Sequence, residues 1–403
     1  MAYQKVTTTS YGQRLKKSGS NVGTGFIMVI AATILLFWNE GRTVKTTKML
    51  KQAQKECVEL GDINTVNAEL NGQMVHASGA YKTDDVLTDG AFGISLNVVR
   101  LSRSVEYYQW VEHQQTETHD KVGGGEETIT TYTYSKEWVS GPVDSGSFKD
   151  PDYQGSNYVR TTVPDNTVTA QKVDFGAYVL PPAMVGAIPA NTSVNVPASL
   201  ANGVDTFVEG NVVYYGENPQ TPAVGDVRVT FTEADGGVAS ILGKVTGNTF
   251  ESYKHKNGKS LMVLKMGEHS QESMFESEKA ANKMILWLLR ILGVILVIAG
   301  LRSMFSILVT LLKVLPFLAN VASVGVNLVT GIVGFIWSLL VIMIAWVAYR
   351  PVLAIALAVV IAGLIYLLIS KSKKAPAEVP AAAAATAAPA APAAPEAPKS
   401  DAE

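Results

Sequence analysis

The sequence has a single cysteine, Cys57, among its 403 residues. No intramolecular disulfide can form, so any domain outside the cytosol must be stabilised by its hydrophobic core alone. The formal net charge is -2, with no excess of basic residues. The composition therefore gives no support to nucleic-acid binding, which requires a basic surface.

The common catalytic motifs are also missing from the sequence. It contains no Gly-rich phosphate loop ending in Lys-Ser or Lys-Thr, no His-Glu-x-x-His pair and no paired cysteines for zinc. His113 and His119 lie six residues apart, so both rings share one face of a regular strand and form a weak candidate metal site. A polar edge strand explains them better, and a helix cap explains His269 and Ser270. We expect no catalytic residue, no cofactor and no bound metal.

Long apolar runs, by contrast, are abundant. A helix needs about 20 mostly uncharged residues to cross a bilayer, and four runs approach or exceed that length: 22–38, 284–301, 326–349 and 352–369. The segment 302–325 carries Arg302 and Lys313, and a charge at the bilayer centre costs roughly 3 kcal/mol. We therefore predict that it is interfacial or re-entrant.

Several charged residues lie at the edges of these runs. At the end of the first run, we expect Arg42 to meet lipid phosphate and Glu40 to cap an amphipathic helix over 43–59. Arg290 lies about two turns inside the second run, from where its long side chain is expected to snorkel to the interface. Arg350 separates the last two runs and is expected just beyond the membrane, in water.

Small residues recur at every fourth position in the last run, at Ala354, Ala358 and Ala362. This spacing allows helix backbones to approach closely within lipid. Alanine is also the best helix former, so helix propensity alone explains the same stripe.

Between the first and second apolar runs, short β-like stretches alternate with Gly, Pro, Asn and Asp. The stretches Val105–Gln115 and Thr128–Trp138 predict a β-hairpin whose long tip contains three consecutive glycines. Residues 73–99 and 206–231 show a similar strand pattern, which indicates either an internal duplication or the ordinary likeness of antiparallel strands. The predicted fold class is an α+β integral membrane protein with four transmembrane helices, one N-terminal and three C-terminal, and a large β-rich extracytosolic domain.

Positive charge before the first run, at Arg14, Lys16 and Lys17, favours a cytosolic N-terminus. Basic residues from Arg42 to Lys55 lie close to the membrane on the opposite side and weaken this topology. The predicted order begins with a cytosolic N-terminus (1–21), a signal-anchor helix (22–38) and the β-rich extracytosolic domain (39–283). A second helix (284–301), the interfacial or re-entrant segment (302–325) and two further helices (326–349 and 352–369) follow. A disordered Ala/Pro-rich cytosolic tail (370–403) ends the chain.

Several stretches together resemble the transmembrane protein 43 family, also called LUMA: Phe37-Trp38-Asn39-Glu40-Gly41-Arg42, Tyr132-Thr133-Tyr134, Lys136-Glu137-Trp138, Glu217-Asn218-Pro219 through Gly225-Asp226-Val227-Arg228-Val229, and Tyr349-Arg350-Pro351. The resemblance implies a four-span protein whose large domain faces the endoplasmic-reticulum lumen or its bacterial equivalent. In animals the family is associated with the inner nuclear membrane, lamins, emerin and self-association. The Ala/Pro-rich tail departs from the animal pattern and looks bacterial, which argues against lamin and emerin as partners. The family carries over no catalytic residue.

Three functional hypotheses follow. The first is a non-catalytic membrane organiser or scaffold that acts by self-association and partner binding. The second is a membrane-associated enzyme with its site in the extracytosolic domain, and the third is a channel or transporter. The expected partners are the lipid bilayer, further copies of the chain and other membrane proteins, without nucleic acid. The expected location is the bacterial inner membrane with the domain in the periplasm, or the endoplasmic reticulum or inner nuclear membrane in a eukaryote.

Overall fold

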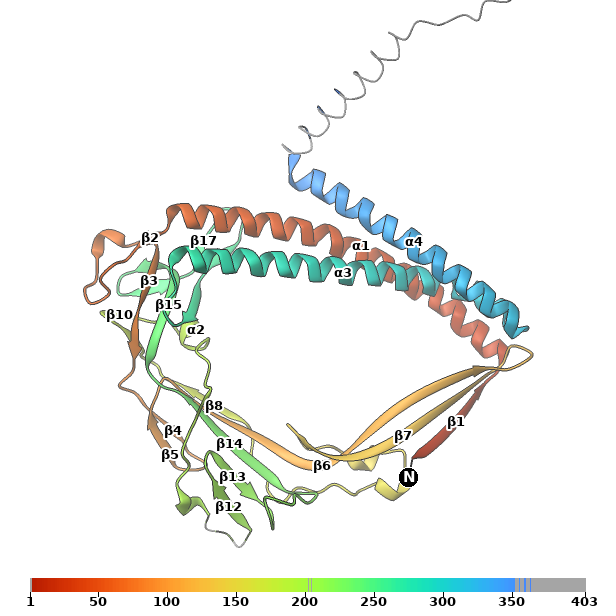
Figure 1. The fold of residues 1–403 in the computed structure, drawn as a ribbon, viewed down its shortest axis with the longest axis horizontal. Coiled ribbons are helices and arrows are strands. Elements are labelled where there is room, and N and C mark those ends of the chain that lie inside the picture. Colours follow the sequence, from red (N-terminus) through yellow and green to blue (C-terminus); the bar gives the residue numbers. More distant parts are fainter. Residues whose placement is uncertain are drawn as a thin grey trace, which may run out of the picture. The chain divides into compact units, whose positions relative to one another are not determined.

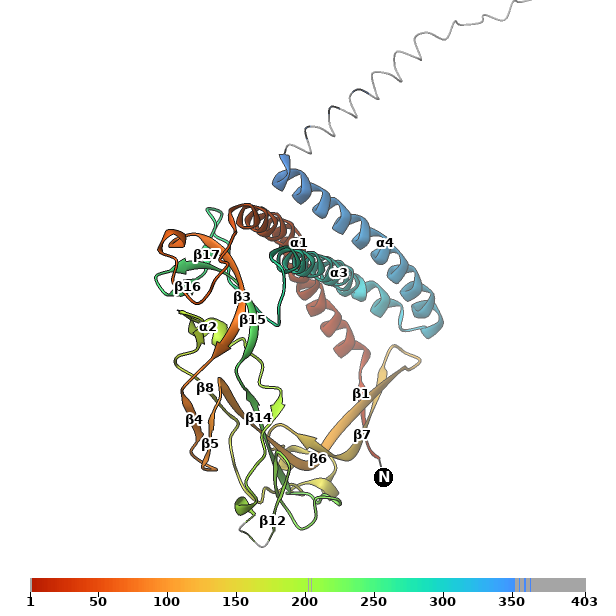
Figure 2. The same cartoon turned by 60° about the vertical axis from the view of Figure 1, so that its left-hand side comes forward.

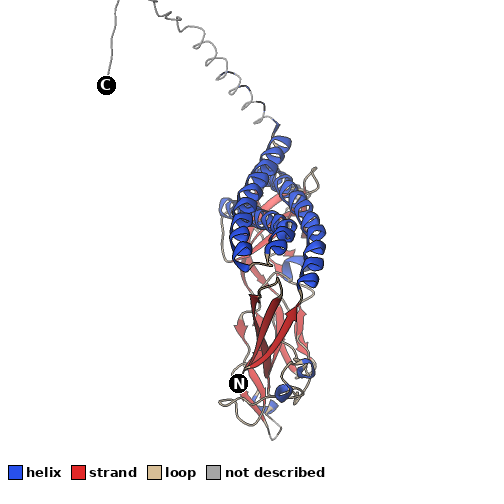
Figure 3. Ribbon diagram, turned by 90° about the vertical axis from the view of Figure 1, so that its right-hand side faces the viewer, coloured by secondary structure: helices blue, strands red, loops and turns tan. Residues whose placement is uncertain are grey.

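The computed structural model of the protein describes residues 2–201, 203, 205–351, 355, 359 and 363. Residues 1–349 form one compact unit and residues 350–403 a second. Within the first unit, three long helices accompany a β-rich body, defined here as strands β2 to β19. Figure 3 shows the helices separated from the bulk of the strands.

The three long helices are α1 (Tyr11–Glu56), α3 (Gln271–Leu312) and α4 (Pro316–Tyr349), and all are long and apolar enough to cross a membrane. They contain the predicted runs 22–38, 284–301 and 326–349. The fourth predicted helix, 352–369, lies outside the described residues except for three positions. The described part of the chain therefore supports three apolar helices, one N-terminal and two C-terminal, rather than four.

The helices are more continuous than the sequence predicts. Residues 43–56 do not form a separate amphipathic helix but continue α1, which runs unbroken for 46 residues. Residues 302–325 do not form a separate interfacial element either, because 302–312 complete α3 and 316–325 begin α4. Only Lys313 to Leu315 interrupt the helical path, so the two apolar helices are joined by a tight turn.

Small residues bring α1 and α3 into close contact in the middle of the helix layer. A Cβ atom built on Gly25 would lie 2.5 Å from the carbonyl oxygen of Gly300, and one on Gly293 would lie 2.5 Å from the side chain of Leu36. The buried residues Ala32, Leu36, Val297 and Val341 form the core shared by α1, α3 and α4. Figures 1 and 2 show α1 and α3 side by side, with α4 near them.

The strands form two large sheets, in which most strand pairs are antiparallel, and two small hairpins. The eight-stranded sheet has the order β1-β7-β6-β14-β13-β12, with β8 on β6 and β11 on β14. Its strands are Tyr3–Thr9 (β1), Arg100–Asp120 (β6), Glu126–Val139 (β7), Asn166–Thr169 (β8), Thr192–Ser193 (β11), Thr206–Glu209 (β12), Val212–Tyr215 (β13) and Val227–Ala234 (β14).

The seven-stranded sheet has the order β19-β15-β16-β10-β9-β3-β2, and β15 also pairs with β3. Two short hairpins, β4–β5 and β17–β18, and one turn of helix, α2 (Pro182–Val185), complete the body. The strands are Val58–Glu59 (β2), Met74–Lys82 (β3), Val86–Asp89 (β4), Ile94–Asn97 (β5), Asp174–Phe175 (β9), Tyr178–Val179 (β10), Gly237–Thr246 (β15), Thr249–Glu251 (β16), Tyr253–Lys254 (β17), Ser260–Leu261 (β18) and Val263–Met266 (β19).

The predicted hairpin is formed by β6 and β7, which pair from Tyr107–Val139 to Asp120–Glu126. The two halves of the suggested duplication, however, fold differently. The first half contributes β3 to the seven-stranded sheet and β5 to a small hairpin, whereas the second contributes β12, β13 and β14 to the eight-stranded sheet. The structure therefore does not support a duplication, and the similar patterns reflect the alternation common to antiparallel strands.

One large core joins both sheets, with Phe175, Tyr178, Phe231 and Ile241 completely or almost completely buried. A second core attaches the C-terminal part of α1 and the start of α3 to the body. There Leu50 and Ala53 of α1 pack with Leu242 of β15 and with Phe275 of α3. The helices are therefore not an independent bundle, because their ends on this side share a core with the sheet.

The close contact between α1 and α3 predicts a specific sensitivity to side-chain volume. Gly25→Leu should destabilise the protein by roughly 1–3 kcal/mol, because the new side chain meets backbone of α3 that cannot move aside. Gly23→Leu is the matched control, since a Cβ atom there has nothing within 4 Å. Thermal unfolding in detergent measures both, and equal melting temperatures for the two variants would contradict this contact.

Candidate functional site

An ion pair is buried between α1 and α3 within the helix layer. Both Nε and Nη2 of Arg290 lie 2.6 Å from Oε1 of Glu40, and the Glu40 side chain is only 1 % exposed. The Arg290 guanidinium also lies 5.0 Å from the centre of the Trp287 ring. The second carboxylate oxygen, Oε2, has no hydrogen-bond partner among the described residues. The Arg290 charge therefore compensates the Glu40 charge where little water is available, through one of the two carboxylate oxygens.

Further polar contacts extend along the same helix interface. Nδ2 of Asn39 donates to the carbonyl oxygen of Leu286 at 3.0 Å, and Nδ2 of Asn282 donates to the carbonyl oxygen of Thr43 at 3.3 Å. Such side-chain to backbone bonds fix the rotation of one helix against the other, because each donor finds its acceptor in only one register.

These contacts bear on two predictions. Arg290 is paired with Glu40, and its predicted snorkelling to the interface stays a prediction. Glu40 does not cap a helix that begins at Thr43, because α1 continues through this position and leaves no N-terminus to cap. Arg42 donates to Asn39 Oδ1 at 3.4 Å and to Thr43 Oγ1 at 3.2 Å, both on its own helix. Its predicted contact with lipid phosphate stays a prediction.

The first and last stretches of the family resemblance meet in this region. The Phe37 and Tyr349 ring centroids are 5.3 Å apart. A Cβ atom on Gly41 would lie 2.5 Å from Cζ of Tyr349, so only glycine leaves room for this ring. The end of α4 therefore lies against the end of the apolar part of α1.

A second polar cluster joins the hairpin to the opposite ends of the helices. We call Arg14, Asp120, Glu126 and Lys313 the ribbon clamp. Nη2 of Arg14 lies 2.7 Å from Asp120 Oδ1 and 3.0 Å from Glu126 Oε2, and the Arg14 side chain is 7 % exposed. Lys313, just after α3, donates to the same Asp120 oxygen at 3.0 Å. One aspartate thus connects α1, the hairpin and the turn between α3 and α4.

Backbone contacts reinforce the ribbon clamp. Arg14 Nη1 donates to the carbonyl oxygens of Gly124 and Gly125 at 3.1 and 3.0 Å. The amide of Gly123 donates to the carbonyl oxygen of Val314 at 3.2 Å. The hydroxyl of Tyr11 donates to the carbonyl oxygen of Leu311 at 3.3 Å. Gly123 and Gly124 adopt positive φ angles, which lets the hairpin tip turn toward the helices.

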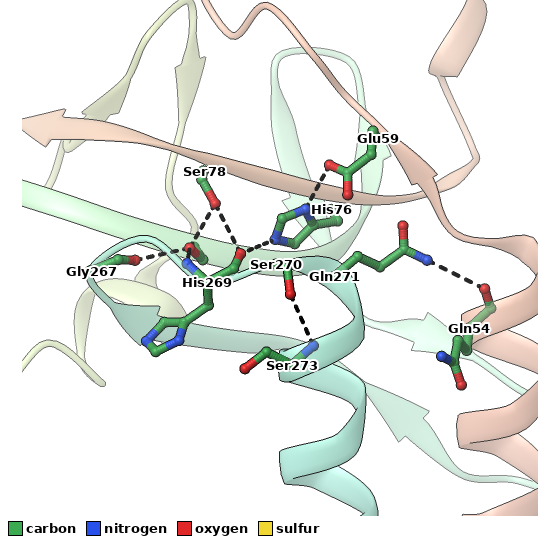
Figure 4. Close-up of polar contacts among 10 residues, drawn as sticks. Gln54, Glu59, His76, Ser78, Gly267, His269, Ser270, Gln271 and Ser273 are labelled. Carbon is green, nitrogen blue, oxygen red and sulfur yellow. Dashed lines mark hydrogen bonds and ion pairs between the residues drawn. The ribbon is translucent and has the colours of Figure 1, made fainter.

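A third cluster holds the start of α3 on the β-rich body (Figure 4). The His76 cluster consists of Glu59, His76, Ser78, Ser240 and His269. His76 Nδ1 lies 2.6 Å from Glu59 Oε2, and Nε2 lies 2.9 Å from the carbonyl oxygen of His269. Ser240 accepts from the amide of His269 at 2.7 Å and donates to the carbonyl oxygen of Gly267 at 2.9 Å. Ser270 then caps α3, as the sequence predicts.

The hydrogen bonds of the His76 cluster join the seven-stranded sheet to the residues just before α3. Both ring nitrogens face oxygens, one a carboxylate and the other a carbonyl, so both are satisfied together when the ring is doubly protonated. The ring is 5 % exposed, and its Nε2 contacts a backbone carbonyl rather than a hydroxyl nucleophile. No sequence motif predicts the role of His76. Its signal is weak: one polar residue inside the apolar stretch Met74 to Ala77.

The two candidate metal ligands each have their own partners on the hairpin. Nε2 of His113 lies 2.8 Å from both Ser135 Oγ and Glu137 Oε1, whereas Nε2 of His119 lies 4.0 Å from Glu117 Oε2. No group of three metal-binding side chains occurs among the described residues. Arg350 directly follows α4, and the stripe Ala354, Ala358 and Ala362 lies outside the described residues.

Comparison with known proteins agrees with the resemblance noted from the sequence. The family model for transmembrane protein 43 matches residues 107–351. The chain belongs to the transmembrane protein 43 family. Its relatives include transmembrane protein 43 of Rattus norvegicus, 32 % identical over 291 residues, which are 70 % of this chain and 72 % of the relative.

Similarity to this family extends to other animals. Transmembrane protein 43 of Homo sapiens is 30 % identical over 302 residues, covering 72 % of this chain and 75 % of the human protein. The transmembrane protein 43 homolog of Drosophila melanogaster is 30 % identical over 288 residues, covering 68 % and 74 % of the two chains. No solved structure matches the chain. The matched region 107–351 contains the hairpin tip, α3 and α4, so it includes three of the four ribbon-clamp residues.

The buried ion pair predicts strong coupling between two helices. Arg290→Met alone should destabilise the protein by roughly 3–5 kcal/mol, because it leaves the Glu40 carboxylate buried and unpaired. The double variant Glu40→Leu/Arg290→Met should recover most of this loss, since two apolar side chains pack without a desolvation cost. Denaturant unfolding in detergent micelles measures both variants. A double variant as unstable as the single one would contradict the pairing.

The ribbon clamp predicts loosening at acid pH. Burial opposes ionisation of Asp120, but hydrogen bonds and charges from Lys313 and Arg14 lower the pKa of its carboxyl overall. Above the ordinary aspartate pKa of about 3.9, the carboxyl is ionised in both the folded and the unfolded protein. In that range its contacts contribute their full stabilisation to the clamp. This stabilisation is lost as the pH falls through the lowered folded value.

Amide hydrogen exchange at residues 121–125, corrected for the intrinsic exchange rate at each pH, measures this loosening. Protection should decrease below about pH 4 in the native protein. In Asp120→Asn it should be lower at neutral pH and should change less on acidification, because Asp120 no longer contributes. Protection in the native protein that does not change with acidification would contradict the role of Asp120.

Proposed function

We propose that this protein is a non-catalytic membrane organiser that acts through its helix layer, by self-association and by binding other membrane proteins. The observation that carries this proposal is that α1 and α3, two of the three long apolar helices, are held on the β-rich body at both ends. A shared apolar core and the His76 cluster hold one side, and the ribbon clamp holds the other. Such mounting gives the helix layer a defined position and rotation, which a simple membrane anchor does not need.

The surface of α4 supports an interaction role. Large apolar side chains are exposed along its length, including Phe317, Leu328, Ile336 and Ile344. One face of α4 packs on the other helices, as at Trp337, whose Nε1 donates to Thr33 Oγ1 at 3.0 Å. Its exposed apolar face is available to lipid or to helices of neighbouring molecules, which associate through close packing in a bilayer.

The Ala/Pro-rich C-terminal sequence is of a kind expected in bacteria, which supports the inner membrane of a bacterium as the location.

The organiser and enzyme hypotheses differ in what a single substitution does. Chemistry depends on a few groups whose removal costs orders of magnitude in rate, whereas an organiser depends on packed surfaces. His113→Ala, His119→Ala and His269→Ala should each retain activity in a complementation assay of a deletion strain. Gly300→Leu, which places a side chain against Val29 and Gly25 of α1, should reduce complementation severalfold.

Gly19→Leu serves as the matched control, since the space around Gly19 is open. Protein amount, membrane insertion and particle mass in detergent are measured for every variant. A histidine variant that inserts and assembles normally but fails to complement would favour the enzyme hypothesis. Full complementation by a Gly300→Leu protein with disturbed assembly would also contradict the organiser hypothesis.

A further inference from the structure

We infer that the groove between α1, α3 and α4 binds one anionic phospholipid, with an acyl chain along the groove and the phosphate at the end that contains Tyr349. The groove consists of two adjoining apolar hollows. Beside its Tyr349 end lie a hydroxyl group and two cations that have no acidic partner among the described residues. This inference does not depend on the organiser function, because an enzyme can hold a lipid in the same way.

Two hollows adjoin on the surface of the helix layer. The first has a volume of about 400 Å³, is bounded by α1, α3 and α4, and reaches Phe26 and Met304. The second has a volume of about 580 Å³, is bounded by α1 and α4, and reaches Trp38 and Tyr349. They share three lining residues, which are Thr33, Ile34 and Trp337. The hollows therefore form one groove, and each has the size of a ligand pocket.

The wall of the groove suits hydrocarbon. Apart from Thr33, every lining residue has an aliphatic, aromatic or thioether side chain. Nε1 of Trp337 donates to Thr33 Oγ1 at 3.0 Å, and this hydroxyl donates to the carbonyl oxygen of Val29 at 2.8 Å. The polar atoms in the middle of the groove are thus paired within the protein. An acyl chain can cover them without leaving a buried polar group unsatisfied.

The length of the groove fits one leaflet of a bilayer. Along α1 it extends from Phe26 to Trp38, or roughly 18 Å at about 1.5 Å per residue. One leaflet contributes about half of the hydrocarbon thickness of about 30 Å. Trp and Tyr rings prefer the level of the headgroups, so Trp38 and Tyr349 mark the end at which a headgroup lies. An acyl chain that starts there can follow the groove to its other end.

Polar groups without acidic partners gather at the headgroup end. The Tyr349 hydroxyl makes no hydrogen bond with a described residue and lies against Gly41, where a Cβ atom would be 2.8 Å from its oxygen. Arg42 follows Gly41, and among the described residues it donates only to two uncharged side chains of its own helix. The exposed Lys45 lies one turn beyond Gly41 on the same face of α1. Neither cation forms an ion pair with a described residue.

The charge at this end selects an anionic headgroup. A guanidinium and an ammonium group both form strong charge-assisted hydrogen bonds with phosphate, and the tyrosine hydroxyl can donate to a further phosphate oxygen. Basic side chains at the membrane surface also attract anionic lipids in general. A zwitterionic lipid carries a cation of its own beside the phosphate, so it gains less from Arg42 and Lys45.

The same charge argues against a protein helix as the occupant. Copies in one membrane share an orientation, so a helix of a second copy would bring Arg42, Lys283 or Arg350 to this depth. The apolar run 352–369 of this chain contains no acidic residue. Neither kind of helix supplies a negative charge, and like charges repel each other. A phospholipid supplies both the apolar chain and the anion.

A photoreactive lipid tests the inference on the full-length protein. The protein is reconstituted in phosphatidylcholine vesicles that contain a small fraction of phosphatidylglycerol with a diazirine in one acyl chain. After irradiation, adducts located by mass spectrometry should concentrate on groove residues such as Ile34, Val333 and Trp337. Ile295 and Leu328 are also exposed but line neither hollow, and they should be labelled severalfold less. Excess phosphatidylglycerol should suppress labelling of the groove more than the same excess of phosphatidylcholine.

Two pairs of variants separate the headgroup from the chain. Arg42→Gln with Lys45→Gln should lower labelling of the groove by roughly tenfold or more, the loss expected for a charge-assisted hydrogen bond. Lys16→Gln with Lys17→Gln is the matched control, because these exposed lysines lie near the other end of α1.

The second pair fills the groove itself. Ile34→Trp places a larger side chain in the shared part of the two hollows and should abolish labelling of the groove. Ile295→Trp is the matched control on an exposed position outside the groove, and it should leave the labelling unchanged. Thermal unfolding in detergent shows whether each variant is folded.

Three results would overturn the inference. Equal labelling of groove and control positions would mean that only ordinary bilayer lipid covers the helices. Labelling of the control positions without the groove would mean that a helix, from the run 352–369 or from a second copy, fills it. Equal competition by the two lipids would remove the anionic headgroup. The labelling pattern of the native protein decides these outcomes without any variant, and it does not depend on whether the protein organises membranes or catalyses a reaction.

Discussion

The Arg14 guanidinium is the interaction on which the arrangement of this protein most depends. It contacts two carboxylates and two backbone carbonyls at the tip of the hairpin, and it comes from a helix that is also joined to the sheet at its other end. Arginine suits this position because its planar group offers five donors in a fixed geometry and stays charged when buried. Together with the β1–β7 ladder and the Lys313–Asp120 pair, this contact attaches the far ends of α1 and α3 to the hairpin.

Short-range sequence patterns predicted much of the fold. The apolar runs, the hairpin around Gly123 to Gly125, and the cap at Ser270 depend on neighbouring residues, so one sequence is enough to find them. The continuity of α1 was missed because Gly41 usually weakens a helix. In the structure, Gly41 is retained within the helix because the Tyr349 ring occupies the space where a side chain would be.

The candidate site was harder to predict, because its partners are distant in the chain. Glu40 pairs with a residue 250 positions away, and Arg14 bonds to a hairpin tip about 110 positions away. Strand β1 was missed for the same reason: Val6 and the three threonines after it form a strand only because β7 offers an open edge. A charge in an apolar run signals that a partner exists, but only the folded chain shows which residue it is.

The length of α1 has a mechanical consequence for the membrane. Its 46 residues extend over roughly 70 Å at about 1.5 Å per residue, more than twice the hydrocarbon thickness of about 30 Å. Less than half of α1 is therefore needed to cross the hydrocarbon, and the remainder is a rigid arm outside it. Because Leu50 and Ala53 on this arm share a core with β15, the arm sets the height of the β-rich body above the bilayer, as a flexible linker could not.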